Sequence, residues 1–272
     1  MPDQYAVIGN PVAHSKSPLI HAAFARQTGQ DLVYERLLAP KDAFVATVDA
    51  FRARGGRGLN VTLPFKLEAF HYATALSERA RAAQAANTLR FDGDAIFADN
   101  TDGAGLVNDL VRNLGCEIAD RRILLLGAGG AARGVIEPLI LQRPGQFVLA
   151  NRSPDKARKL AQDFGRGIEP SSYAALAGRQ FDIVVNATSA SIAGELPPLP
   201  PGVFAQDALA YDMMYGKVAT PFLSLARREG AARLADGLGM LVEQAAESFF
   251  IWRGVRPDSA PVLQLLRQTK DD

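Results

Sequence analysis

The feature that most constrains the fold of this chain is a glycine-rich turn that follows a short apolar run. The run within Arg122–Leu126 is typical of a strand buried in a parallel sheet. The next seven residues, Gly127-Ala128-Gly129-Gly130-Ala131-Ala132-Arg133, fit the pattern G-x-G-x-x-A at the entrance to a helix. Gly127 would permit the tight turn, Gly129 would let the backbone approach a pyrophosphate, and Ala132 would allow close helix–strand contact.

The pattern alone is also compatible with an ordinary glycine turn, so its surroundings decide how much weight it carries. A further strand is predicted at Phe147–Ala150, at the distance expected of a βαβ unit. The N-terminus of the helix between the two strands would offer free N–H groups and a positive dipole to phosphates. The sequence therefore predicts a dinucleotide site that includes Gly127, Ala128, Gly129, Gly130 and Ala131.

The residues after the second strand indicate which dinucleotide is bound. A protein that binds NAD usually has an acidic residue here, against the ribose hydroxyl. This chain has Asn151-Arg152-Ser153 followed by Lys156, a basic tip suited to a 2′-phosphate. The sequence therefore favours NADP over NAD, although the same charges would also suit an exposed helix start. Thr188 and Ser189, at the end of a later strand, suit the ribose or nicotinamide.

Strand-like and helix-like runs alternate along most of the chain, which predicts an α/β protein with crossover helices. In the first hundred residues we expect strands at Tyr5–Ile8, Val33–Leu38, Gly58–Val61, Thr88–Phe91 and Ile96–Ala98, and helices at Ser17–Thr28 and Ala43–Arg54. Later strands are expected at Arg122–Leu126, Phe147–Ala150, Phe181–Val185, Ala208–Asp212 and Arg233–Ala235, and later helices at Met240–Trp252 and Ser259–Gln268.

The length of 272 residues suits two domains of ordinary size. We expect a mixed or parallel α/β domain at residues 1–102 and a Rossmann domain at residues 103–239. A helix is predicted to link them, because its apolar residues recur at the spacing of one helical face, at Leu106, Val107, Leu110, Val111 and Leu114.

The charge balance argues against several classes of partner. Lys plus Arg number 30 and Asp plus Glu number 29, with no long block of one sign, so nothing suggests a binder of nucleic acid or membrane surfaces. We expect neither a signal peptide nor a membrane span. One cysteine and three histidines without ligand spacing predict no disulfide and no metal site. The expectation is a cytoplasmic protein that acts on a small molecule.

Three polar clusters in the first domain each follow a predicted strand. They are His14-Ser15-Lys16-Ser17-Pro18, Asn60-Val61-Thr62-Leu63-Pro64-Phe65-Lys66, and Asn87-Thr88 together with Asn100-Thr101-Asp102. Their hydroxyls, amides, ammonium and carboxylate suit a substrate with several hydroxyls and a carboxylate. Each also has an ordinary structural explanation, since Ser17 and Asp102 would cap helices and Lys66 would be a solvated lysine. Spacing alone leaves both interpretations open.

Ten segments of the chain, in order, resemble the shikimate dehydrogenase family almost from end to end. They lie at 7–18, 60–66, 85–89, 99–103, 127–133, 151–153, 186–189, 211–215, 220–223 and 236–245. The loop at 189–191, Ser-Ala-Ser, departs from the family's commoner Ser-Gly. The resemblance implies an oxidoreductase that uses NADPH to reduce 3-dehydroshikimate to shikimate, on the route to chorismate and the aromatic amino acids, working as a monomer or homodimer.

The resemblance also implies roles for individual residues. Lys66 and Asp102 would be the catalytic pair; Lys66 would donate a proton to the new hydroxyl, or would stay cationic while water relays the proton. Substrate binding is implied for Ser15, Ser17, Thr62, Lys66, Asn87, Asp102, Tyr215 and Gln244, and cofactor contacts for Met213, Gly237 and Glu78. The C-terminal helices at 240–272 would complete the first domain, and the active site would lie in a cleft between domains.

Three rival functions share part of this pattern. A quinate or quinate/shikimate dehydrogenase would often use NAD, which the basic tip at Arg152 disfavours. A folate-type methylene dehydrogenase is disfavoured by Lys66 and Asp102 between hydroxyl-rich loops. A catalytically silent NADP-binding sensor would keep the glycine turn and lose the polar clusters, which are intact here.

Overall fold

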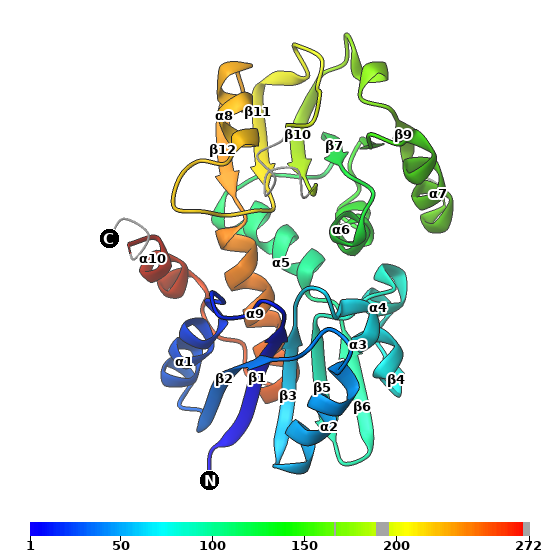
Figure 1. Ribbon diagram of the computed structural model, residues 1–272. Coiled ribbons are helices and arrows are strands. Elements are labelled where there is room, and N and C mark those ends of the chain that lie inside the picture. The colour runs from blue at the N-terminus through cyan, green and yellow to red at the C-terminus, as the bar shows by residue number, and fades with distance from the viewer. Residues whose placement is uncertain (166, 189–195, 269–272) are drawn as a thin grey trace. The chain divides into compact units, whose positions relative to one another are not determined.

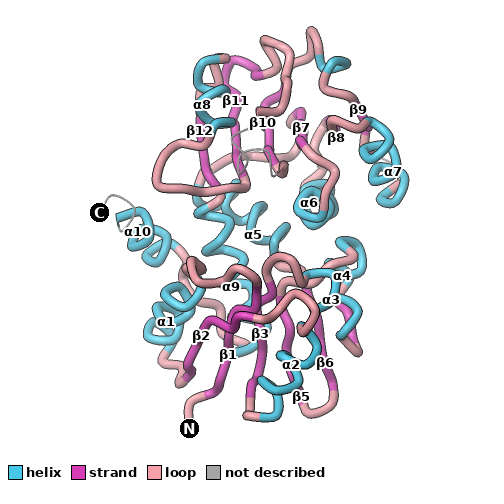
Figure 2. Tube along the Cα trace, in the orientation of Figure 1, coloured by secondary structure: helices cyan, strands magenta, loops and turns pink. Residues whose placement is uncertain are grey.

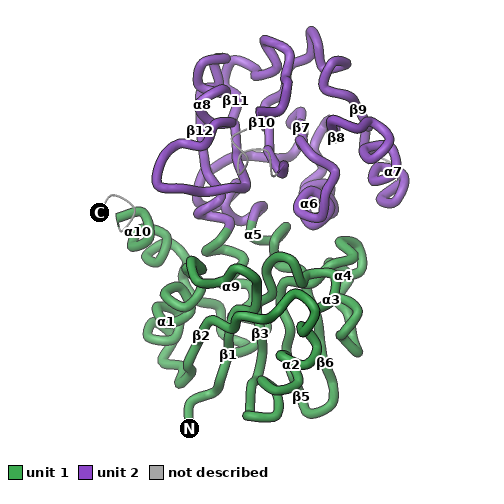
Figure 3. Tube along the Cα trace, in the orientation of Figure 1, with its two compact units in different colours: residues 1–105, 241–270, 272 green, residues 106–240, 271 purple. Residues whose placement is uncertain are grey.

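The computed structural model describes residues 1–165, 167–188 and 196–268. The chain forms two compact units (Figure 3). Of the described residues, unit 1 contains 1–105 and 241–268, and unit 2 contains those within 106–240. The boundaries fall inside two helices, α5 (Asp102–Asn108) and α9 (Leu238–Arg253).

Unit 1 is built on a mixed six-stranded sheet in the order β2-β1-β3-β5-β6-β4 (Figure 1). Its strands are β1 (Asp3–Gly9), β2 (Leu32–Leu38), β3 (Gly56–Val61), β4 (Ala75–Leu76), β5 (Thr88–Asp92) and β6 (Ala95–Asp99). Strand β1 runs parallel to β2 and β3, whereas β5 runs antiparallel to both β3 and β6. The start of β5 therefore lies beside the ends of β3 and β6.

Side chains alternate across this sheet, and the two faces are covered differently. Leu59 and Val61 belong to an apolar core with Phe44 and Phe65, from α2 (Phe44–Ala53) and the turn before α3 (Lys66–Tyr72). Asn60 points to the opposite face, where it meets side chains of α1 (Ser17–Thr28) and α9. Unit 1 also contains α4 (Glu78–Ala83) and α10 (Ala260–Gln268).

Unit 2 has an all-parallel sheet in the order β12-β11-β10-β7-β8-β9. Its strands are β7 (Arg122–Leu126), β8 (Gln146–Ala150), β9 (Glu169–Ser171), β10 (Phe181–Asn186), β11 (Phe204–Asp212) and β12 (Arg233–Asp236). The crossovers include α6 (Gly130–Ile140), α7 (Pro154–Phe164), a 3-10 turn (Ala174–Leu176) and α8 (Pro221–Arg228) (Figure 2). The strand order reverses between β7 and β10, the position at which doubly wound sheets bind ligands.

The predicted α/β class is confirmed, two local expectations need correction, and two short strands were missed. Ser17 does not cap α1, because the helix already begins at Ser17 with Lys16 as its N-cap; Pro18 fits the first turn, where its missing N–H costs no bond. Val111 is exposed, because Asp109–Asn113 forms a π-helical turn whose spacing differs from 3.6 residues. The short strands β4 and β9 were not predicted, since two or three residues carry too little pattern.

Candidate functional site

The register of the unit 1 sheet brings three polar segments to one end of it. Asn60 at the end of β3 pairs with Thr88 at the start of β5, and Thr88 pairs with Asp99 at the end of β6. Residues that flank these strand ends therefore converge although they are far apart in the sequence. Sequence reasoning placed each cluster after a strand, but Asn87 and Thr88 stand at the start of β5, and the antiparallel pairing of β5 brings them to the same end.

Lys66 and Asp102 form an ion pair at this end of the sheet. Each is the first residue of a helix, α3 and α5 respectively. Lys66 Nζ donates to Asp102 Oδ2 at 2.5 Å, and Asn87 Nδ2 donates to Asp102 Oδ1 at 2.8 Å. The side chains of Lys66 and Asp102 are 29% and 15% exposed, so the pair is sheltered but remains open to a ligand. An ammonium held this way can donate a hydrogen bond or a proton to a bound oxygen.

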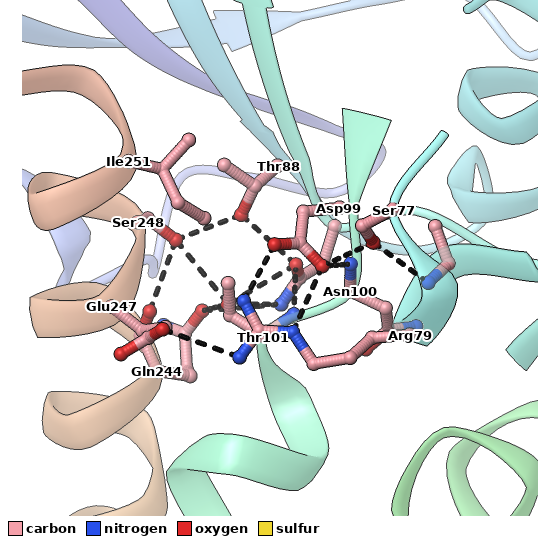
Figure 4. A network of polar contacts seen from close by, with 12 residues as sticks. Ser77, Arg79, Thr88, Asp99, Asn100, Thr101, Gln244, Glu247, Ser248 and Ile251 are labelled. Carbon is pink, nitrogen blue, oxygen red and sulfur yellow. Dashed lines mark hydrogen bonds and ion pairs between the residues drawn. The ribbon is translucent and has the colours of Figure 1, made fainter. Parts of the chain in front are cut away.

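Asn87 links this ion pair to α9 and to the turn before α5. Its Nδ2 also lies 2.9 Å from Thr101 Oγ1 and 3.3 Å from Gln244 Oε1, while its Oδ1 accepts from the backbone N of Thr101 at 2.9 Å. Figure 4 shows Thr101 and Gln244 in this network. The structure thus brings together Lys66, Asn87, Asp102 and Gln244, all four of which the sequence predicted as site residues.

Asn60 is the centre of a polar cluster that sequence reasoning did not assign. Its Nδ2 donates to Asn87 O at 3.2 Å and to Ser248 Oγ at 2.9 Å, and its Oδ1 accepts from Tyr34 Oη at 2.8 Å. Asn60 belongs to the motif at 60–66, so the sequence could have pointed to it. Ser248 lies in an apolar helix and belongs to none of the motifs. The cluster ties the Asn87 segment to α9.

His21 and Tyr34 support Asn60 from the α1 side. The His21 ring stacks on Tyr34 with centroids 4.2 Å apart, and its Nε2 lies 3.1 Å from Asn60 Oδ1. Because that oxygen is an acceptor, Nε2 carries the proton. Burial lowers the pKa of His21 to about 3, opposed by the bond to Asn60, so the ring stays neutral. Burial raises the pKa of Tyr34 well above its usual value, opposed by a hydrogen bond with Ser17.

Ser15 and Thr62 lie in unit 1 on the loops after β1 and β3, and Ser17 is the first residue of α1. Ser15 Oγ lies 3.2 Å from Ser17 Oγ and accepts from the backbone N of Ser17 at 3.3 Å. Ser17 is not a helix cap, and its hydroxyl bonds Ser15 Oγ and the Tyr34 hydroxyl instead. Thr62 is half-buried, and its methyl lies where a Cβ on Gly9 would stand. Only glycine at position 9 allows the two loops to approach this closely.

The glycine turn of unit 2 joins β7 to α6 as predicted. Gly127 has φ +104°, which disfavours any residue with a side chain, and a Cβ there would lie 3.1 Å from the Thr188 methyl. A Cβ on Gly129 would meet no described heavy atom within 4 Å, so the backbone is open to a ligand on this side. Ala128 is half-buried, Gly130 and Ala131 are exposed, and Ala132 is fully buried in the core.

The predicted basic tip follows β8 on the surface of unit 2. Arg152, Ser153 and Lys156 are exposed, and Asn151 Nδ2 donates to Ser153 O at 3.0 Å. Arg152 lies close enough to Tyr173 for its charge to oppose the rise that burial causes in the pKa of Tyr173. Arg158 forms an ion pair with Asp155. Arg152 and Lys156 therefore place two positive charges on the exposed surface after β8.

The segment after β10 lies beside the end of β11. Thr188 Oγ1 donates to Asn186 Oδ1 at 2.7 Å, and Met213 N donates to Asn186 O at 3.0 Å. A Cβ on Gly237 would overlap Met213 O, so Met213 and Gly237 are in direct backbone contact. Ser189, also predicted as a cofactor contact, lies outside the described residues.

The remaining predicted residues divide between the units. Tyr215 is half-buried in unit 2, where burial and the charge of Asp236 raise its pKa. Glu78 is the exposed first residue of α4 in unit 1. The described part of the chain holds neither a set of three side chains that could bind a metal ion nor a helix suited to crossing a bilayer.

Three family descriptions match successive parts of the chain. Residues 7–89 match "Shikimate dehydrogenase substrate binding domain", residues 109–193 match "Shikimate / quinate 5-dehydrogenase", and residues 237–267 match "Shikimate 5'-dehydrogenase C-terminal domain". Together they span most of the two units.

Relatives with curated names and solved structures agree with these matches. A protein of Nitrosospira multiformis called shikimate dehydrogenase (NADP(+)) is 62% identical over 99% of this chain and 98% of its own length. An Ael1 enzyme from Pseudomonas putida has 53% identity and a TM-score of 0.93, covering 97% of this chain and 98% of that one. Shikimate 5-dehydrogenase from Thermus thermophilus, solved with NADP(H) and shikimate, has 32% identity and a TM-score of 0.86, covering 98% and 99%.

Proposed function

This chain belongs to the shikimate dehydrogenase family, and on that premise we propose that it catalyses the reversible, NADPH-dependent reduction of 3-dehydroshikimate to shikimate. The observation that carries the proposal is the ion pair of Lys66 with Asp102, bonded to Asn87 at the polar end of the unit 1 sheet. A catalytically silent NADP-binding protein would have no need of this arrangement.

The residues of unit 2 suit NADP. The turn at Gly127 presents the N-terminus of α6, whose free N–H groups and dipole favour phosphates, and the open side of Gly129 leaves room for them. Arg152 and Lys156 supply positive charge for a 2′-phosphate. Further contacts are proposed for Glu78, Asn151, Ser153, Thr188, Ser189, Met213 and Gly237.

In the proposed mechanism, bound NADPH supplies a hydride to the carbonyl carbon of the substrate. Lys66 donates a hydrogen bond to the carbonyl oxygen and a proton as that oxygen becomes a hydroxyl, and accepts the proton in the reverse direction. Asp102 orients the ammonium and the substrate hydroxyl. The other substrate contacts are proposed to be Ser15, Ser17, Thr62, Asn87, Tyr215 and Gln244, which supply hydroxyl and amide groups.

We further propose that most substrate contacts lie in unit 1 and most cofactor contacts in unit 2, with Tyr215 of unit 2 and Glu78 of unit 1 as the exceptions. The reaction would serve the route to chorismate and the aromatic amino acids in the cytoplasm, with the enzyme as a monomer or homodimer. The names of the relatives support the pathway.

A spectrophotometric assay of the purified protein tests the proposal. Shikimate with NADP+ should give NADPH, and the same protein should be assayed with quinate and with NAD+ in each combination. Turnover that is highest with shikimate and NADP+ is the expected result. Equal or higher turnover of quinate, or with NAD+, would favour a quinate/shikimate dehydrogenase, and no turnover of either acid would contradict the enzymatic assignment.

A further inference from the structure

Arg79, on α4, bonds Asp99 at the end of β6 and Glu247 on α9, as Figure 4 shows. Its Nε and Nη2 donate to the two carboxylate oxygens of Asp99 at 3.1 and 2.5 Å, and its Nη1 donates to Glu247 Oε1 at 3.2 Å. The planar guanidinium therefore holds Asp99 with two bonds and α9 with a third. Burial lowers the pKa of Arg79, but the bonds to Asp99 and Glu247 raise it by more, so the side chain stays charged.

Asp99 transmits this constraint to the turn that leads to Asp102. The Asp99 side chain is only 5% exposed, and its Oδ1 also accepts from Ser77 Oγ at 2.6 Å and from Asn100 N at 2.7 Å. Asn100 Oδ1 then accepts from the backbone N of Asp102 at 3.1 Å. Two successive hydrogen bonds thus connect the Asp99 carboxylate to the backbone of the residue that holds Lys66.

The backbone of Asp99 also holds Asn87, which is the other residue besides Lys66 that bonds the Asp102 carboxylate. Asp99 O accepts from Asn87 N at 3.0 Å, and Asn87 Nδ2 donates to Asp102 Oδ1. Both the position of Asp102 and the position of its amide donor therefore depend on how Asp99 is held. Arg79 is the cation that fixes Asp99 from outside the turn.

We propose that Arg79 is a positioning residue of the reaction, which orients the Asp102 carboxylate against Lys66 by holding Asp99. The inference rests on the proposed function, since it concerns the same site. Ion pairs of this kind contribute little net stability, because desolvation offsets their attraction, but they can fix one geometry. A misplacement of about 1 Å at reacting groups can cost about 10²-fold in rate.

The first test compares Arg79→Gln with Arg256→Gln. Arg256 Nη1 donates to the other oxygen of Glu247 at 2.7 Å, so this control disturbs the same carboxylate on α9 and leaves the bonds to Asp99 in place. Arg79→Gln should lower kcat roughly 10–100-fold with the KM for NADP+ unchanged. Arg256→Gln should keep kcat within about twofold of the wild type. Equal kcat in the two variants, with both folded, would overturn the proposal.

A double-mutant cycle separates positioning from a general structural role. If Arg79 acts through the Asp102 carboxylate, adding Arg79→Gln to Asp102→Asn should lower kcat by less than about twofold further. Independent effects would instead multiply, and that result would contradict the proposal. Single-turnover measurements give the rates of the slow variants.

Arg79→Lys keeps the test informative if Arg79→Gln does not fold. Lysine retains the charge but cannot form the paired bonds to Asp99, so kcat should fall about 3–10-fold, with the melting temperature close to that of the wild type. A kcat equal to that of the wild type in this variant would overturn the positioning role. Wild-type activity measured in parallel separates failure of the positioning role from failure of the proposed function. No shikimate-dependent turnover in the wild type contradicts the proposed function itself.

Discussion

The polar end of the unit 1 sheet and the glycine turn of unit 2 are built in opposite ways. In unit 1, side chains bond one another: Asn87 alone contacts Thr101, Asp102 and Gln244. In unit 2 the turn depends on residues that have no side chain. Gly127 has a positive φ, and Gly129 has open space where a Cβ would stand. The first region offers donors and acceptors in fixed directions, and the second offers backbone and space.

This difference predicts how substitutions behave in each region. Removing a side chain in unit 1 leaves several partners unsatisfied, so effects there should be coupled and large. In unit 2 the damaging changes should be those that add atoms to the turn or remove the charge beside it. The four predictions below test this contrast.

The largest effect is expected for Lys66→Ala, which removes the ammonium from its ion pair with Asp102. Turnover should fall about 10²–10⁴-fold, with a smaller change in the KM for shikimate, because the lost proton donor acts mainly in the transition state. Steady-state kinetics with shikimate and NADP+ measure both constants. Lys41→Ala, at an exposed lysine of unit 1, is the control and should leave them unchanged. Near-normal turnover of Lys66→Ala would remove this residue from the chemistry.

Removing the charge at the tip of β8 should affect the cofactor alone. Arg152→Gln is expected to raise the KM for NADP+ about 10–100-fold, because a charge-assisted hydrogen bond contributes about 1.5–3 kcal/mol. The KM for NAD+ should not change. Arg158→Gln is the matched control, because Arg158 is an exposed arginine of the same segment and its guanidinium bonds Asp155. An equal rise in KM for both cofactors would show that Arg152 does not read the 2′-phosphate.

Adding one methyl group to the glycine turn should weaken cofactor binding without touching the substrate region. Gly127→Ala forces a side chain into a φ of +104° and towards Thr188, at a cost of about 1–2 kcal/mol. The KM for NADP+ should rise about 5–30-fold and the KM for shikimate should not. Gly178→Ala is the control, because Gly178 also has a positive φ, of +77°, with no described heavy atom within 4 Å of its Cβ position. A loss of cofactor affinity in both variants would point to general destabilisation of unit 2.

The smallest effect concerns the buried histidine that supports Asn60. The pKa of His21 falls from 6.5 to about 3 on folding, so between these values only the unfolded chain takes up the proton. Stability is therefore present above pH 6.5 and is lost as the pH falls towards 3. Between about pH 7.5 and about pH 5.5 the loss is about 1.4 kcal/mol.

His21→Gln keeps a donor for Asn60 and removes the titration. Its free energy of unfolding, measured in urea at both pH values, should show a loss smaller than that of the wild type by about 1.4 kcal/mol. The exposed His14 and His71 remain in both proteins and serve as an internal control. The same pH dependence in the wild type and His21→Gln would show that His21 is not the group that titrates.

The amino-acid sequence determined the local features of this protein. Strand β7 and the turn at Gly127 could be predicted because the apolar run, the glycines and the following helix are all adjacent in the chain. Helix α1 was predicted with its observed bounds for the same reason. Lys66 and Asp102 could be paired only through the resemblance to a family, because 36 residues separate them and no periodicity relates them.

Only the tertiary structure decided which side chains share a hydrogen bond. The antiparallel pairing of β5 sets Asn60 beside Thr88, and the packing of α9 adds Ser248 from a distance of 188 residues along the chain. The link from Arg79 through Asp99 likewise joins residues that no sequence pattern connects. The physical reason is that propensity and periodicity act over a few residues, whereas strand register and helix packing are set by burial of apolar surface across the whole unit.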